Sequence, residues 1–299
     1  MNPLDRSLLT LDGVSLGDSF GQTFFDAEAV ATERISTRTL PDATWYLTDD
    51  SIMASAVHST LASRGSIDQY ELISRFVQLY ERDRSRGYGA TMARMLRLVA
   101  DGSDWREVSS GAFDGMGSFG NGAAMRVAPV GAYFAGDDQK IAEQARLSAE
   151  TTHTHVEGIA GAVAVAIACG WAVVHGTSKL ESSQAFLIHV AEHTPHSITR
   201  DQIFRAAELP VSYDVRTAVT VLGNGINLSS QDTVPFSLWC AAKHIESFTS
   251  AMWTTVSGLG DRDTTCAIVG GVVSLAVGAG GLPPEWLERR EALTQWLGC

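Results

Sequence analysis

Two short acidic clusters stand near opposite ends of the sequence, and each is flanked by apolar residues. The first is Thr48-Asp49-Asp50-Ser51 and the second is Asp261-Arg262-Asp263-Thr264. Carboxylates in such surroundings lose water when the chain folds, and a buried charge is costly unless a cation or hydrogen bonds compensate it. The pairing therefore predicts one buried metal site with oxygen ligands.

The ligand types favour a hard cation. Aspartate and threonine oxygens suit Mg²⁺, with Mn²⁺ as a substitute, whereas the Cys/His ligand spacings of structural zinc are missing from the sequence. Two divalent ions would be bridged by carboxylates and completed by hydroxyls, with water retained for reaction. The metal ligands that we expect are Thr48, Asp49, Asp50, Asp261, Asp263 and Thr264. Metal-assisted hydrolysis is the chemistry that this composition suggests.

Helix capping is the alternative reading of each cluster. An aspartate at a helix N-terminus accepts backbone hydrogen bonds and interacts favourably with the helix dipole. Asp49 and Asp50 precede the apolar run that starts at Ile52, and Asp263 precedes a longer one. Capping explains either cluster alone, but it explains the two together less well.

The elements that must position both clusters are expected to be helices. Apolar side chains recur at three and four positions, Gly and Pro separate helix-sized blocks, and strand signals are sparse. Helical stripes are clearest over Tyr70–Tyr80, Met92–Val99 and Ile141–Ala149. We expect an all-α fold and one domain over residues 1–299, because no linker divides the chain and the clusters require its ends to converge.

Charge and apolar segments argue against two classes of partner. The net charge is -12 and no basic patch is visible, so we expect no stable nucleic-acid binding. Two uncharged segments, Ile159–Val174 and Cys266–Ala279, fall short of the roughly 18 to 20 apolar residues that cross a bilayer. We interpret them as buried helices, and we expect a monomer without a membrane partner.

Four widely spaced cysteines and an acidic start without signal-peptide character indicate a cytoplasmic protein.

A glycine-rich loop spans residues 117–122 and precedes a small-residue segment. Free backbone donors in such a loop can hold a phosphate. By itself this signal is weak, because glycine loops more often make tight turns or allow close helix packing.

Five motifs occur in the order found in one family. They are Gly17-Asp18-Ser19-Phe20-Gly21, Trp45-Tyr46-Leu47-Thr48-Asp49-Asp50-Ser51, Gly117-Ser118-Phe119-Gly120-Asn121-Gly122-Ala123-Ala124-Met125-Arg126, Thr152-His153-Thr154-His155 and Gly260-Asp261-Arg262-Asp263-Thr264-Thr265. Over almost its whole length the chain resembles the ADP-ribosylglycohydrolases. Five ordered matches are far more specific than any one of them.

The resemblance implies a compact orthogonal multi-helix fold that binds two Mg²⁺ ions and ADP-ribose or an ADP-ribosylated substrate. It implies that the loop cradles the diphosphate, that Phe113 and Phe119 hold the adenine between their rings, and that His153 lies near the ribose. The ligand-binding residues would be Phe113, Gly117, Ser118, Phe119, Gly120, Asn121, Gly122 and His153. Considered alone, a histidine at a helix start, such as His153, is more often a capping or structural residue.

The reaction implied is hydrolysis of the glycosidic bond at ribose C1'', which releases ADP-ribose. Asp49, Asp50 and Asp263 are the catalytic candidates. The residues do not assign the general base, for which Asp263 and Asp50 are comparable candidates. Asp18 would support the site or cap the first helix. The alternatives are a metal-dependent nucleotide phosphohydrolase and an ADP-ribose-binding protein with impaired catalysis.

One position departs from the family pattern. A glutamate commonly follows the Gly-Asp pair of the first motif by seven residues, and this chain has Phe25 there. Asp26 and Glu28 are the nearby acidic substitutes. The missing acid raises the prospect of altered substrate choice, altered regulation or weak hydrolysis, and the acceptor group is open between serine, arginine, a base and a small molecule.

Overall fold

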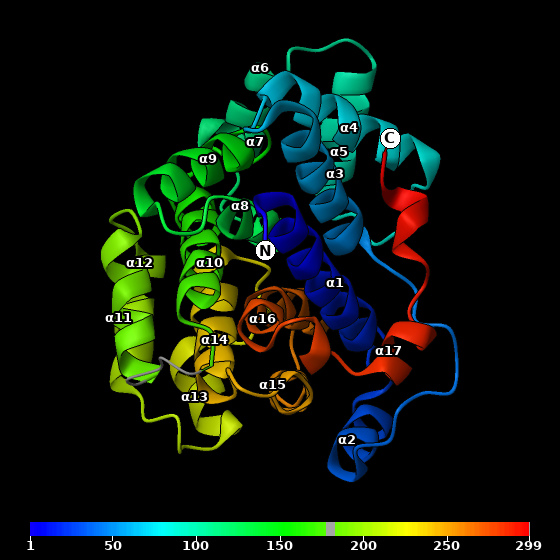
Figure 1. Cartoon of the computed structure of the whole chain (residues 1–299). Helices are drawn as coiled ribbons and strands as arrows, with labels where there is room; N and C mark the ends of the chain where they lie inside the picture. The colour runs from blue at the N-terminus through cyan, green and yellow to red at the C-terminus, as the bar shows by residue number, and fades with distance from the viewer. Residues whose placement is uncertain (178–182, 299) are drawn as a thin grey trace.

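The computed structural model describes residues 1–177 and 183–298, and every regular element in these ranges is a helix. Two isolated β-bridges pair Trp45 with Arg290 and Gly120 with Ser229. The prediction of an all-α fold is confirmed (Figure 1). The helices of the first half are α1 (Pro3–Gln22), α2 (Glu28–Thr37), α3 (Asp49–Arg64), α4 (Gln69–Arg82), α5 (Ala90–Ala100), α6 (Trp105–Ser110), α7 (Ala112–Gly115), the 3₁₀ turn η1 (Asn121–Ala123), α8 (Ala128–Tyr133) and α9 (Asp138–Glu150). Those of the second half are α10 (Val156–His175), α11 (Ser183–His193), α12 (Ile198–Glu208), α13 (Val215–Leu222), α14 (Ser230–Lys243), α15 (Phe248–Val256), α16 (Arg262–Val277), η2 (Ala279–Gly281), α17 (Pro284–Arg289) and η3 (Leu293–Trp296).

The three helical stripes of the sequence fall inside α4, α5 and α9. Local chemistry fixes where these helices begin. The Asp68 carboxylate accepts from the backbone N–H of Glu71 at 3.0 Å, and Asp137 accepts from that of Lys140 at 2.9 Å. Each of these aspartates satisfies one of the unpaired donors of a helix N-terminus.

Helices α1 and α16 come from opposite ends of the chain and pack side by side (Figure 1). Gly13, Gly17 and Gly21 form one stripe on α1 and face Gly270, Cys266 and Arg262 in reverse order, so the helices are antiparallel. A Cβ on Gly17 would lie 2.0 Å from the carbonyl oxygen of Cys266. Only glycine permits this approach, which brings the start of α16 to the end of α1.

Helix α10 contains the first uncharged segment, and α16 contains the second except for its last two residues. Both helices are largely buried, as expected. Helix α10 packs against α8, α9, α14 and α16. By length and composition it is the one helix in the described ranges that could span a membrane, yet 78% of its apolar window is buried inside the protein. Packing against neighbouring helices therefore accounts for its apolar composition.

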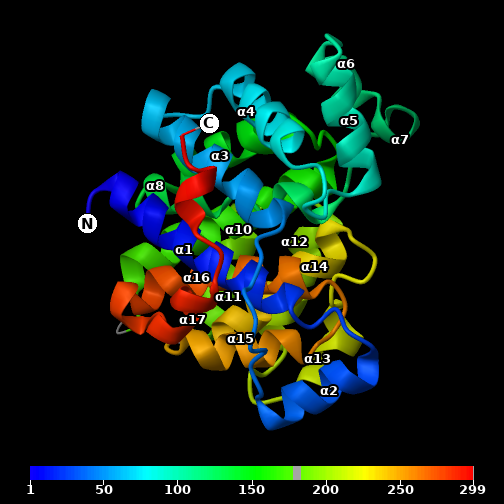
Figure 2. The ribbon, with the colours of Figure 1, turned by 90° about the vertical axis from the view of Figure 1, so that its right-hand side faces the viewer.

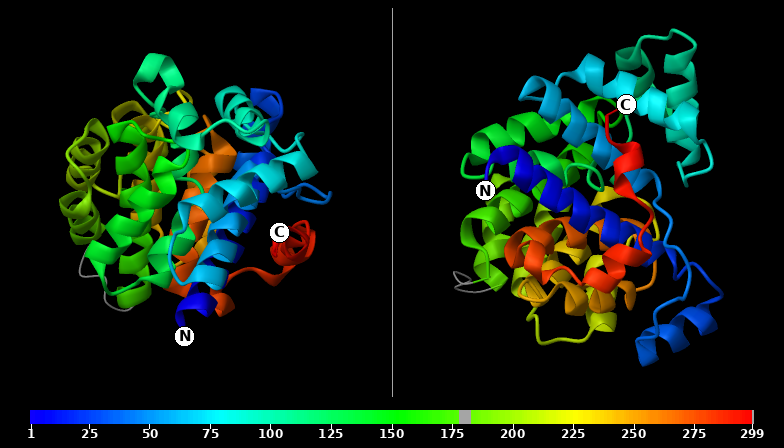
Figure 3. Two further views of the ribbon diagram at one scale, coloured as in Figure 1. Left: turned by 90° about the horizontal axis from the view of Figure 1, so that it is seen from above. Right: turned by 45° about the vertical axis from the view of Figure 1, so that its right-hand side comes forward.

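The C-terminal segment fixes the approach to α3 (Figures 2 and 3). The backbone of Trp45 donates to the Arg289 carbonyl at 2.8 Å and accepts from Glu291 at 2.9 Å. The Glu291 carboxylate accepts from the N–H of Leu47 at 3.1 Å and pairs with Arg86 at 2.7 Å. The residues just before Thr48 are thus held by the last part of the described chain.

Buried apolar side chains from α1 to η3 form one continuous core. An aromatic group at the end of α1 belongs to it and includes Phe20, Phe24, Trp45, Trp253 and Trp286. The continuous core supports the interpretation of residues 1–299 as one domain, which stays a prediction. Helix α2 lies at the edge of the molecule, away from the centre of this core (Figure 2).

Candidate metal centre

Asp18 on α1 organises the start of α3. Its Oδ1 accepts from the Thr48 hydroxyl at 2.7 Å, and its Oδ2 accepts from the Thr48 backbone N–H at 2.9 Å and from the Ser51 hydroxyl. Burial raises the pKa of Asp18 to about 6, although the hydrogen bonds from Thr48 and Ser51 lower it. Asp18 therefore anchors α3, and does not cap the first helix.

Carboxylates from three helices converge at this point. Oxygens of Asp18 on α1, Asp50 on α3 and Asp263 on α16 all lie within 4.8 Å of one another. Asp50 is only 2% exposed, and its Oδ1 has no hydrogen-bond partner among the described residues. Burial raises the pKa of Asp50 well above its usual value, and the charge of Asp263 raises it further. Such a group of oxygens fits a divalent cation, which would supply the missing compensation.

The other expected ligands surround these three carboxylates. Thr48 is the N-cap of α3, and its hydroxyl lies 3.2 Å from Asp50 Oδ2. Asp49 is buried, and burial followed by the charge of Asp18 raises its pKa to about 8. We call the full set the acidic centre: Asp18, Thr48, Asp49, Asp50, Asp261, Asp263 and Thr264.

Asp261 joins the acidic centre to the glycine loop. Its Oδ2 accepts from the Asn121 side-chain amide at 2.7 Å, and the same amide donates to Thr233 at 3.0 Å. The backbone N–H of Asn121 donates to the Leu228 carbonyl at 3.1 Å. The donors of Asn121 thus connect the loop with Asp261, and ligand binding by this residue stays a prediction.

The glycine loop keeps other donors available. The N–H of Gly120 donates to the Ser118 hydroxyl at 3.3 Å, whereas those of Ser118 and Phe119 have no acceptor within the described ranges. Gly117 adopts φ +75°, and a Cβ there would lie 2.2 Å from the Thr154 hydroxyl oxygen. The loop is thus pressed against the start of α10, with two N–H groups left for an anion.

Phe113 and Phe119 do not form an open clamp in this structure. Their ring centroids are 5.3 Å apart with an interplanar angle of 39°. A base inserted between two rings requires about 7 to 8 Å, which is two van der Waals layers. Phe113 and the following Asp114 adopt positive φ values of 51° and 57°, a costly conformation for residues with a side chain. Adenine binding by this pair stays a prediction, and it requires the rings to separate.

His153 is buried beside the glycine loop. A Cβ on Gly122 would lie 3.3 Å from His153 Nε2, and the Nδ1 atom is 2.7 Å from the Thr152 hydroxyl. Burial, with a contribution from the Arg126 charge, lowers the pKa of His153 to about 3. A neutral imidazole therefore faces the loop, as its expected place near a bound ligand requires.

Arg126 interacts with the charge of Asp49 and was not among the predicted site residues. It is fully buried, lies 4.5 Å above the Phe76 ring and donates to the Thr152 hydroxyl at 2.7 Å. Burial lowers its pKa to about 9, while the charge of Asp49 acts in the opposite direction. Its position as the single charged residue in 115–136 was the available signal.

Phe25 takes a structural place at the end of α1. The Arg262 guanidinium lies 5.1 Å from the Phe25 ring centroid and donates to the Phe24 carbonyl at 3.1 Å. Arg262 is thus directed toward the α1 terminus. Asp26 pairs with Arg34, and the exposed Glu28 begins α2, so neither of the two acids belongs to the three-carboxylate group.

Metal removal should make the stability of the protein fall with rising pH. Because Asp18 and Asp49 have pKa values of about 6 and about 8 in the folded protein, against 3.8 ordinarily, the folded state retains protons that the unfolded chain has released. Stability from this source is complete below about pH 4 and is lost as the pH rises to about 8. Urea denaturation in chelator across this range measures the loss.

Added Mg²⁺ should remove most of this pH dependence, since only ionised carboxylates bind it and their mutual repulsion is then compensated. A metal-free protein whose free energy of unfolding increases between about pH 4 and pH 8 would contradict the burial of these carboxylates. Ca²⁺ and Na⁺ at matched ionic strength provide the controls for cation size and screening.

Comparisons with known proteins find similarity over most of the chain. The family model described as ADP-ribosylglycohydrolase matches residues 1–298. The chain is 28% identical over 274 residues to ADP-ribosylhydrolase ARH3 of Homo sapiens, covering 82% of this chain and 75% of that protein. It is 26% identical to the ADP-ribosyl-[dinitrogen reductase] glycohydrolase of Rhodospirillum rubrum, covering 95% and 90%. A solved structure, titled ADP-ribosylglycohydrolase-related protein complex, superposes with a TM-score of 0.70 at 23% identity over 99% of this chain and 95% of that one.

Proposed function

The chain belongs to the ADP-ribosylglycohydrolase family and is a glycohydrolase enzyme, and from this premise we propose that it is a magnesium-dependent ADP-ribosyl-acceptor hydrolase. It would cleave the bond between ribose C1'' and an acceptor atom of a protein or small molecule, releasing ADP-ribose. The observation that carries the proposal is the buried, unpartnered Oδ1 of Asp50 within a group of three carboxylates from α1, α3 and α16.

The proposed metal ligands are Thr48, Asp49, Asp50, Asp261, Asp263 and Thr264, with two Mg²⁺ ions that Mn²⁺ can replace. When bound, the ions would orient the ribose hydroxyls and lower the pKa of a coordinated water. We now assign Asp18 the role of holding α3, through its bonds to Thr48 and Ser51. Asn121 would in the same way hold Asp261 at a fixed place.

Proton acceptance is assigned to the catalytic candidates Asp49, Asp50 and Asp263. Asp49 is the one of these that lies outside the three-carboxylate group, so it has the greatest freedom to keep an oxygen unligated. Burial and the charge of Asp18 raise the pKa of Asp49 to about 8 while the Arg126 charge opposes the shift, and a bound cation would further favour the ionised form that accepts a proton. The N–H groups of Ser118 and Phe119 and the neutral His153 would orient the diphosphate and the ribose.

A panel of defined ADP-ribosyl conjugates tests this function. Serine-, arginine-, base- and small-molecule-linked ADP-ribose are each incubated with and without Mg²⁺, and the products are separated. We expect free ADP-ribose from at least one conjugate, with release dependent on Mg²⁺. Release of phosphate or AMP from free ADP-ribose would instead identify a nucleotide phosphohydrolase. Tight binding of ADP-ribose without turnover of any conjugate would identify a catalytically impaired protein, as expected if Phe25 removes an essential acid.

The proposed location is the cytoplasm, and the proposed state is a monomer. The burial of Cys169, Cys240 and Cys266 as free thiols is compatible with a reducing compartment. Light scattering coupled to size-exclusion chromatography measures the mass of the particle directly.

A further inference from the structure

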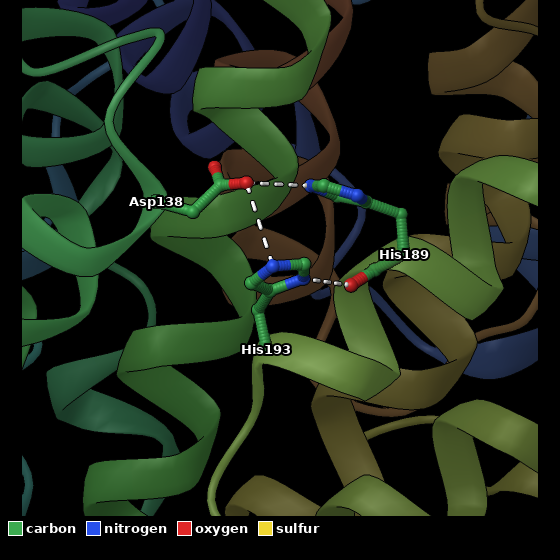
Figure 4. Close-up of side chains that lie close together, drawn as sticks. All are labelled: Asp138, His189 and His193. Atoms are coloured by element: carbon green, nitrogen blue, oxygen red, sulfur yellow. Dashed lines mark hydrogen bonds and ion pairs between the residues drawn. The ribbon is translucent and has the colours of Figure 1, made fainter.

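A second group of potential ligands lies outside the acidic centre. Asp138 is the first residue of α9, and His189 and His193 stand one helical turn apart on α11. Asp138 Oδ2 is 3.1 Å from His189 Nε2 and 3.6 Å from His193 Nε2. Figure 4 shows one carboxylate oxygen directed at both imidazole rings. We call these three residues the histidine cluster.

The hydrogen bond of His193 fixes which ring nitrogen carries its proton. Its Nδ1 lies 2.8 Å from the backbone carbonyl of His189 (Figure 4), and a carbonyl can only accept. A neutral His193 therefore bears its hydrogen on Nδ1 and presents the Nε2 lone pair to Asp138. Two acceptor atoms then face each other, which is unfavourable unless a proton or a metal ion lies between them.

We propose that the histidine cluster binds a divalent transition-metal ion of the zinc class through Asp138 Oδ2, His189 Nε2 and His193 Nε2. With metal–ligand bonds of about 2.0 to 2.1 Å, tetrahedral coordination separates neighbouring ligand atoms by about 3.3 to 3.4 Å. The distances from Asp138 Oδ2 to His189 Nε2 and His193 Nε2, 3.1 and 3.6 Å, lie on either side of that value, and all three ligand atoms lie within 4.8 Å of one another.

The environment leaves a fourth position for water. The side chains of Asp138, His189 and His193 are 30%, 28% and 39% exposed, so an ion reaches them from solvent. The hydrogen bond from His193 Nδ1–H to the His189 carbonyl is also of the kind that typically orients a metal-binding histidine. For binding, a neutral His189 must carry its hydrogen on Nδ1, which releases Nε2 to the metal.

The histidine cluster and the acidic centre should select different ions. Imidazole nitrogens suit Zn²⁺, Co²⁺, Ni²⁺ and Cu²⁺, whereas an all-oxygen site suits Mg²⁺. The ion would connect α9 with α11. Because it would bind the folded protein and not the unfolded chain, it would stabilise the folded state by mass action. The proposal is independent of the hydrolase function, because none of these three residues belongs to the acidic centre.

Calorimetric titration of the untagged, metal-free full chain with Zn²⁺ tests the proposal, with excess Mg²⁺ present to occupy the acidic centre. We expect one zinc equivalent that the His189→Gln/His193→Gln double variant binds at least about tenfold more weakly. Asp138→Asn should produce a similar loss. The matched control is His196→Gln, which removes an exposed histidine that contacts Arg200 and should leave the affinity unchanged.

Co²⁺ provides a spectroscopic measurement on the same proteins. Four-coordinate nitrogen and oxygen ligation should give visible d–d absorption bands in the wild type and in His196→Gln, and the bands should be lost in the double variant. Zinc affinity that is equal in the wild type and the double variant would overturn the proposal. So would the absence of any zinc equivalent in the wild type, a result that requires no variant to fold.

Discussion

Replacing Asp263 by alanine should lower hydrolysis of an ADP-ribosyl conjugate by about a hundredfold or more and weaken its dependence on Mg²⁺. A metal that stabilises developing charge contributes several kcal/mol to the transition state, and each 1.36 kcal/mol is a factor of ten in rate. Asp263 contributes one of three carboxylates within 4.8 Å, so no other side chain on α16 restores the set at the same place. Rates measured over a series of Mg²⁺ concentrations separate weaker metal binding from slower chemistry.

Asp263→Ala should do little harm to the metal-free fold. The variant loses the 2.8 Å bond from the Thr264 N–H, but it also removes a buried carboxyl group whose ionisation is opposed by burial and by the charges of Asp261 and Asp18. These two effects have opposite signs, so the free energy of unfolding in chelator should stay close to that of the wild type. The matched control is Asp42→Ala, whose side chain is fully exposed beside Arg289. Full activity of Asp263→Ala with an unchanged Mg²⁺ requirement would refute the acidic centre as the metal site.

Replacing Gly17 by alanine should destabilise the protein by about 3 kcal/mol or more. The added Cβ would stand 2.0 Å from the Cys266 carbonyl oxygen, and backbone atoms of a packed helix cannot rotate away as a side chain can. Alanine favours an isolated helix by about 1 kcal/mol relative to glycine, which is too little to offset this clash. Urea denaturation in the absence of metal measures the effect.

Relaxation of Gly17→Ala would have to move α16 away from α1. Asp263 would then separate from Asp18, so Mg²⁺ affinity and hydrolysis should fall together with stability. Gly280→Ala is the control, since its Cβ meets nothing within 4 Å and its backbone needs no positive φ. Wild-type stability in Gly17→Ala would show that the two helices have room to separate without cost.

Phe25 occupies the position where the family commonly has a glutamate, and its ring has a packing role there. The ring is 47% exposed and supports the Arg262 guanidinium beside the start of α16. The side chain therefore contributes to holding α16, while the acidic function expected there has no replacement from Asp26, which pairs with Arg34.

Local sequence signals predicted helices well because the information lies within each segment. The apolar period of α4 and the cap by Asp68 are properties of neighbouring residues, and both predict the same element. Asp49 and Asp263 were placed at helix starts for the same reason, and α3 and α16 do begin there. The metal and capping interpretations are not exclusive, since Thr48 both caps α3 and faces Asp50.

Contacts between segments that are far apart in the sequence were harder to predict. The separation of the Phe113 and Phe119 rings depends on two residues at positive φ, and a six-residue spacing does not specify it. The bond from Asn121 to Asp261 joins positions far apart in the chain. Glycines at positions 13, 17 and 21 were a readable signal for close helix packing, but the partner helix was not identifiable from them.

The sequence by itself determined the helical class and the residue types of the acidic centre, and from those types it predicts a hard cation. These follow from periodicity, capping and ligand chemistry, which need only the identities of nearby residues. The tertiary structure decided that Asp18 shares the centre with Asp50 and Asp263, that Asn121 holds Asp261, and that Asp138 meets His189 and His193. The physical reason is that these contacts depend on how closely whole helices approach, and that distance is set by small residues such as Gly17 on surfaces that only folding brings together.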